Sequence, residues 1–75
     1  MTYDEAVAAI PPGLYTHFKG GDYEVIGVAL HTETFDPLVI YKKDHLYARP
    51  ADMWYEKMRV GNSFCPRFTR KDDKQ

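Results

Sequence analysis

The sequence predicts a mainly β protein: a small SH3-like antiparallel barrel of about five strands with a short N-terminal helix. Apolar and polar residues alternate in short runs separated by turns rich in Gly, Asp and Pro, a pattern typical of antiparallel strands. Gly27 interrupts the longest run, and a glycine at such a position favours a bulge or a sharp bend. A bent second strand would let the sheet close, and closure would hide the strand edges of a chain of only 75 residues.

The N-terminal segment predicts a helix of about two turns. Thr2 can act as its N-cap, and Glu5 follows three residues later, as a capping box requires. Val7 and Ile10 lie on one face, and the Pro-Pro-Gly of residues 11–13 ends the helix. Because so short a helix is unstable alone, we expect it to dock on the sheet.

Five runs are predicted to form the strands. These runs are residues 14–19, 23–31, 38–42, 46–49 and 54–60. Residues 20–22, Gly-Gly-Asp, fit a hairpin turn between the first two strands, because glycine adopts positive φ without a steric clash. Pro50 precedes a single helical turn at residues 51–53, and a helix continuing through Glu56 is the alternative for the start of the last strand.

These elements divide the chain into three segments. The segments are the N-terminal helix with its proline stop at residues 1–12, the barrel domain at residues 13–68 and a charged, flexible tail at residues 69–75. Within the barrel domain, residues 64–68 are expected to fold back onto the strands. In the first strand, the alternation places Tyr15 and His17 on one face, which we expect to be the outer, solvated one.

Composition excludes several classes of protein. The chain is 44% hydrophobic and 15% aromatic, which is typical of a folded domain. Its net charge of -1 argues against a nonspecific binder of phosphate backbones. No apolar run approaches the ~20 residues of a membrane span, and the acidic N-terminus does not resemble a signal peptide. With Cys65 as the single cysteine, we expect no internal disulfide and a cytoplasmic location.

Five motifs together resemble a known family. They are GLYxHFKG at residues 13–20, YEV at 23–25, AxHTET at 29–34, VIY at 39–41 and RPxxMW at 49–54. In combination they are similar to the bacterial family called domain of unknown function 1653 (DUF1653), over about residues 13–60. The resemblance implies an SH3-type barrel, and because the family has no assigned biochemical role it implies no activity.

His31 and Glu33 form the first candidate site. They stand two residues apart at a predicted strand end, so both side chains could point the same way. An imidazole beside a carboxylate can relay protons or hold a polar ligand. The alternative is structural: the Thr and Glu side chains of this segment satisfy backbone groups, while His31 fills a polar gap at the rim.

Arg49 is the second candidate, because a guanidinium can bind a carboxylate or a phosphate in a forked geometry. The alternative is a structural ion pair with Glu33 or Asp52 over an aromatic face. The full set of residues predicted to bind ligand is Tyr15, His31, Glu33, Tyr41, Arg49 and Trp54.

No motif predicts a metal, a cofactor or a catalytic nucleophile. The three histidines are fourteen residues apart, and there is no HxH, HxxxH or CxxC motif. We therefore expect no metal site and no cofactor.

The sequence favours a noncatalytic binding or accessory module. The ligand classes left open are a peptide, a small polar or acidic molecule and a nucleic acid, bound through an aromatic rim carrying His and Arg. Two alternatives remain: a minimal hydrolase with His31 and Glu33 as its acid–base pair, and a structural homo-oligomer such as a homodimer. No membrane partner is expected.

Overall fold

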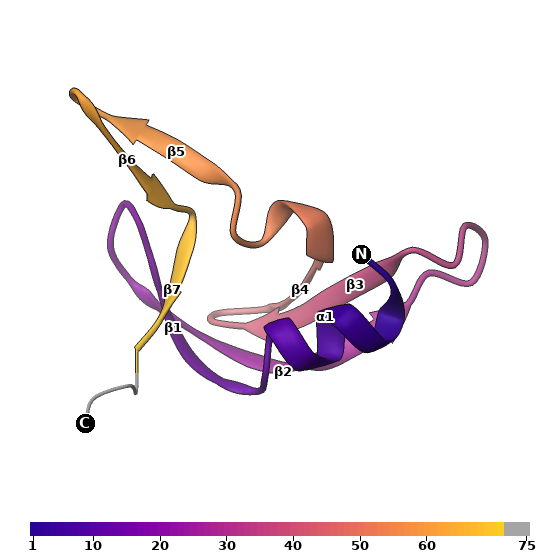
Figure 1. Cartoon of the computed structure of the whole chain (residues 1–75). Coiled ribbons are helices and arrows are strands. Elements are labelled where there is room, and N and C mark those ends of the chain that lie inside the picture. Colours follow the sequence, from indigo (N-terminus) through magenta and orange to yellow (C-terminus); the bar gives the residue numbers. More distant parts are fainter. Residues whose placement is uncertain (72–75) are drawn as a thin grey trace.

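The computed structural model describes residues 1–71 of the chain (Figure 1). In chain order its elements are α1 (Tyr3–Ala9), β1 (Gly13–His17), β2 (Asp22–Leu30), β3 (Pro37–Lys42), β4 (Leu46–Pro50), the 3-10 turn η1 (Ala51–Met53), β5 (Lys57–Val60), β6 (Ser63–Pro66) and β7 (Phe68–Arg70). The predicted helix, the first four strands and the helical turn are therefore confirmed, with ends shifted by one or two residues. No helix within this part of the chain is long and apolar enough to cross a membrane.

An open antiparallel sheet forms the body of the molecule, in the order β4-β3-β2-β1-β7, and β5 pairs only with β6. No closed barrel is found within residues 1–71, since the two edge strands of the sheet, β4 and β7, do not pair with each other. The predicted fifth strand, 54–60, begins later, at Lys57, and turns back at Gly61, whose φ is +61°. Local pairing across such a short turn has a lower loop-closure cost than pairing with a distant strand.

The segment after the β5–β6 hairpin supplies the fifth strand of the sheet. Thr69 and Arg70 lie in β7, paired with Thr16 and Tyr15 of β1. The predicted flexible tail therefore does not begin at Thr69, and its last residues, 72–75, lie outside the described part of the chain. Sequence reasoning missed this strand because a run of only three residues carries too little alternation to be recognised.

Glycines shape the sheet as predicted. The β2–β3 register shifts between Val25 and Gly27, which is the expected bulge. Gly20 and Gly21 have φ of +100° and +94° in the β1–β2 turn, a region that residues with a Cβ rarely adopt.

One face of the sheet is covered by α1, η1 and the chain that follows η1 (Figure 1). The buried core consists of Ala6, Ile10, Tyr15, Val25, Val39, Tyr41, Ala51, Trp54 and Phe68. Tyr15 belongs to this core, so the face of β1 that we expected to be outer is the inner one. The prediction failed because Leu14, which looks like a core residue, remains 46% exposed on the uncovered side.

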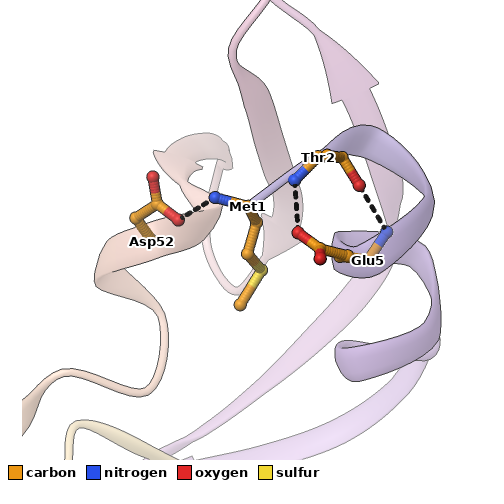
Figure 2. Close-up of polar contacts among 4 residues, drawn as sticks. All are labelled: Met1, Thr2, Glu5 and Asp52. Carbon is orange, nitrogen blue, oxygen red and sulfur yellow. Dashed lines mark hydrogen bonds and ion pairs between the residues drawn. The ribbon is translucent and has the colours of Figure 1, made fainter.

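The helix is held at both ends by specific hydrogen bonds. The predicted capping box is present: the Thr2 hydroxyl accepts from the Glu5 backbone N–H, and the Glu5 carboxylate accepts from the Thr2 N–H (Figure 2). The Met1 ammonium also contacts Asp52 of η1 at 2.6 Å. At the other end, the Tyr55 hydroxyl donates to the Ala9 carbonyl. These contacts fix a helix of seven residues that would not be stable alone.

Replacing Thr2 by Ala should lower the free energy of unfolding by about 1 kcal/mol, because the Glu5 N–H loses its acceptor. Urea unfolding followed by circular dichroism measures this change. Thr32→Ala, at an exposed turn position, is the matched control and should have little effect. Equal losses in the two variants would show that the cap does not stabilise the helix.

Candidate functional site

Three of the six predicted ligand-binding residues are core residues. Tyr15 and Trp54 are completely buried, and Tyr41 is 7% exposed. The Tyr15 hydroxyl donates to the Pro11 carbonyl, and burial raises the pKa of this phenol well above its usual range. Tyr15 and Trp54 therefore cannot contact a ligand in this conformation. Tyr41 is almost as deeply buried, but its ring packs against the more exposed rings of Tyr23 and Tyr47.

His31 closes the β2–β3 turn. Its Nδ1 accepts from the backbone N–H groups of Glu33 and Thr34, at 3.1 and 3.3 Å. Within residues 1–71, no hydrogen bond or ion pair joins the imidazole to the Glu33 carboxylate, which is exposed. The role of His31 is therefore structural, but it differs from the structural alternative stated above, because the imidazole itself accepts from the backbone. Of the Thr and Glu side chains expected to do this, the Thr34 hydroxyl accepts from the Asp36 N–H.

The structure also separates His31 from Arg49. The register pairs Arg49 with Val39, and Val39 with Val28. His31 lies three residues beyond Val28, so it is ~10 Å further along the strand direction and two strands away across the sheet. The six predicted residues therefore do not form one site.

Because two backbone N–H groups depend on His31, its replacement by Ala should cost about 1–2 kcal/mol of stability. His31→Asn should recover much of this loss, since the Asn side-chain oxygen can accept from the backbone two residues on. Chemical denaturation of both variants tests the idea. An Asn variant as unstable as the Ala variant would contradict it.

A different group of side chains gathers at the other end of the same face, and we call it the basic–aromatic surface. It consists of His17, Tyr23, Lys43, Arg49, Arg67 and Phe68. These residues come from β1, β2, the β3–β4 turn, β4, the chain between β6 and β7, and β7. Of the six, only Arg49 belongs to the site predicted from the sequence.

Aromatic rings form the floor of this surface. The buried Phe68 ring meets His17 edge-on at 5.0 Å and Tyr23 edge-on at 5.6 Å. Tyr23 in turn meets Tyr41 at 5.7 Å. Edge-to-face packing at these distances is favourable beyond the area that it buries. The rings therefore stabilise one another while His17 and Tyr23 remain half-buried.

Cationic side chains lie on these rings. The Lys43 ammonium sits 5.0 Å from the centre of the Tyr23 ring, and the Arg49 guanidinium carbon sits 6.0 Å from that of Phe68. Both distances are typical of cation–π contacts. Lys43 also reaches the β1–β2 turn, where a Cβ added to Gly21 would lie 2.8 Å from its Nζ. The turn glycine thus leaves room for this lysine.

His17 is surrounded by positive charge. Burial lowers its pKa from the ordinary 6.5, and the cations of Arg67, Arg49, Lys19 and Lys43 lower it further. His17 Nδ1 accepts from the Lys19 backbone N–H at 3.2 Å, so the neutral ring carries its proton on Nε2. The surface therefore presents donors and cations, and its ring nitrogen acceptor is already engaged.

Two arginine donors at this surface have no hydrogen-bond partner within residues 1–71. They are the Nε groups of Arg49 and Arg67, both buried. The indole N–H of Trp54 is the third such buried donor. Arg67 does bind Glu56, through its terminal nitrogen at 2.9 Å. Because an unsatisfied buried donor is costly, this arrangement favours an added acceptor.

No enclosed pocket is found among residues 1–71, so the basic–aromatic surface is open and shallow. The same residues contain no cluster of His, Cys, Asp and Glu that could hold a metal ion. The cations and donors of the basic–aromatic surface can contact the oxygens of an anion.

Stability should fall as the pH falls below 6.5, because folding lowers the pKa of His17 and the unfolded chain therefore takes up its proton first. The stability that the neutral His17 contributes is fully present above the pKa of His17 in the unfolded chain. It is lost as the pH falls toward the lower pKa of His17 in the folded protein. Urea unfolding between about pH 7.5 and pH 5 measures it, and His17→Asn should show a weaker pH dependence. An NMR titration that places the His17 pKa at or above 6.5 would contradict the assignment.

Comparison with known proteins agrees with the family resemblance. The sequence profile of the family described as "Protein of unknown function (DUF1653)" matches residues 13–70. The chain belongs to the DUF1653 family. The match includes every strand and the whole basic–aromatic surface, and it leaves out α1.

A solved DUF1653 structure has the same fold. The crystal structure of a DUF1653 protein from Bordetella bronchiseptica is 28% identical, with a TM-score of 0.77. The alignment covers 87% of this chain and 91% of that one. Comparison with curated proteins gives no match.

Sequence reasoning missed most of the basic–aromatic surface for a definable reason. His17 and Tyr23 belong to family-like motifs, but we placed His17 on a solvated outer face. Lys43 and Arg67 lie in turns or between short strands, where periodicity carries no signal. The usable signal was the pairing of Lys or Arg with nearby rings in residues 17–23 and 41–49.

Proposed function

We propose that this DUF1653 protein is a noncatalytic module that binds an anionic ligand on the basic–aromatic surface. The observation that carries the proposal is that cations from separate segments lie over connected rings, with Arg49 over Phe68 and Lys43 over Tyr23. Arg67 precedes Phe68 in the chain. Like charges held together repel one another, and a bound anion would offset that repulsion. The family has no assigned function, so the proposal depends on these contacts alone.

The polar residues of the basic–aromatic surface would each make a different kind of contact with the anion. Arg49 and Arg67 supply guanidinium donors, which match the oxygens of a carboxylate or a phosphate. The His17 Nε2–H is a neutral donor, and Lys43 adds a flexible charge. Among the described residues 1–71, none of these groups is paired with a nucleophile in the manner of hydrolytic enzymes, which is why we favour binding over catalysis.

Arg49→Ala should weaken binding of inorganic pyrophosphate, used as the probe anion, about 10- to 150-fold, because a charge-assisted hydrogen bond contributes ~1.5–3 kcal/mol. An NMR titration that follows the His17 and Tyr23 signals measures the dissociation constant. The dissociation constants of the parent protein and the variant should be compared at the same salt concentration, since salt screens exposed charges.

Lys42→Ala is the matched control, because it removes the same charge from the exposed residue after Tyr41, on the opposite face of β3. This variant should change the affinity little. If both variants weaken pyrophosphate binding equally, the binding is a general effect of charge and not of this site. If circular dichroism shows that Arg49→Ala is unfolded, the role of Arg49 is structural.

A further inference from the structure

Charge is strongly segregated along the molecule. In Figure 1 the β2–β3 turn lies at the right end of the molecule, and α1 and η1 lie between it and the centre. Residues 1–12, 31–37 and 51–53, which include these segments, contain no Lys or Arg. Their acidic residues are Asp4, Glu5, Glu33, Asp36 and Asp52. The β1–β2 turn and the β5–β6 hairpin lie at the opposite end.

The rest of residues 1–71 holds every Lys and Arg of this range, and three of its four acidic side chains, all but the exposed Glu24, are engaged. Asp22 contacts Lys71, Glu56 contacts Arg67, and Asp44 accepts from the Tyr47 hydroxyl at 2.6 Å. The net charge of -1 is therefore the sum of an acidic part and a basic part of the molecule, whose charges nearly cancel. Such a dipole steers a polyanion to the basic end, so the whole-chain charge does not exclude a phosphate-backbone ligand.

Exposed aromatic rings accompany the cations of the basic half. Tyr47 on β4 is 38% exposed, and its ring lies 5.5 Å from that of Tyr41 in the floor of the basic–aromatic surface. Phe64 on the β5–β6 hairpin is 65% exposed and pairs across the hairpin with Arg59. Binding of a simple anion does not require exposed aromatic rings, whereas unpaired bases stack on such rings.

We propose that the anion is the backbone of a single-stranded nucleic acid, which crosses the basic–aromatic surface with bases stacked on Tyr47 and Phe64. This inference rests on the proposed function and names its ligand. Proteins that bind single strands combine a basic track for the phosphates with aromatic platforms for the bases. Base pairing would hide the faces that these rings need, so a duplex fits the surface poorly. An open surface without an enclosed pocket also suits an extended ligand.

The first experiment measures binding of a fluorescein-labelled single-stranded 12-mer, as DNA and as RNA, by fluorescence anisotropy at several salt concentrations. The expected result is saturable binding whose logarithm falls linearly with the logarithm of salt concentration, with a slope of roughly -0.7 for each phosphate contacted. A blunt duplex of the same length should bind more weakly. An oligoglutamate of similar charge should compete poorly, because it has no bases to stack.

The second experiment separates stacking from charge. Tyr47→Leu and Phe64→Leu should each weaken binding of the single strand roughly 5- to 150-fold, as expected for one lost base stack. Neither should change the affinity for pyrophosphate to the same extent. Phe35→Leu is the matched control, because Phe35 is 70% exposed at the acidic end and should not affect binding. Tyr47→Phe keeps the ring and should preserve affinity.

The outcomes distinguish the two proposals. If Arg49→Ala weakens pyrophosphate binding while both Leu variants bind the single strand as well as the parent does, the anion site stands and the nucleic-acid ligand is wrong. If oligoglutamate binds as tightly as the single strand, the ligand class is an acidic peptide. If neither pyrophosphate nor the single strand shifts the His17 and Tyr23 signals, both proposals fail.

Discussion

The stacking of Trp54 on Phe68 is the contact on which the rest of the structure depends. The two rings are parallel within 4°, their centres are 3.8 Å apart, and both are almost completely buried. Trp54 follows η1, and Phe68 begins β7, so the stack ties the end of the four-stranded meander to a strand formed after the hairpin. In a chain this small, where folding buries only about 60% of the surface, such a pair supplies a large part of the core.

The stack also determines where the basic–aromatic surface lies. Phe68 contacts His17, Tyr23 and Tyr41 as well as Trp54, with ring centres between 3.8 and 5.7 Å apart. The Arg49 guanidinium lies over the same ring, and Arg67 precedes it in the chain. The basic–aromatic surface is therefore the solvent-facing side of the core. Its cations are positioned by the same rings that hold the sheet together. Large changes to these rings would affect folding and binding together.

Local signals in the sequence predicted local structure well. The capping box, the Gly-Gly turn, the bulge at Gly27 and the helical turn after Pro50 each depend on a few adjacent residues, and each is present. Long-range arrangement was harder. Whether the sheet closes depends on the pairing of residues 57–60, and a turn at Gly61 gave that segment a nearby partner instead.

The candidate site shows the same limit in another form. Arg49 lies over the Phe68 ring, but the residues predicted to join it do not, since the His31 imidazole binds its own turn and Tyr15 and Trp54 belong to the core. Choosing the wrong face for β1 was sufficient to hide His17, because side chains alternate and a one-residue error moves every one of them to the other side.

The separation of charge gives a reason for a small domain to carry unsatisfied donors buried beneath a basic surface. Holding Arg49, Arg67 and Lys43 near the half-buried His17 costs stability through repulsion and through donors without acceptors. An anion that binds only the folded state would recover that cost and stabilise the fold in proportion to its concentration. The acidic residues of the β2–β3 turn do not weaken this effect, because that turn lies at the other end of the sheet (Figure 1) and charges beyond about 8 Å are largely screened at physiological salt. A chain with a nearly neutral total charge can therefore retain a locally strong field for an anion.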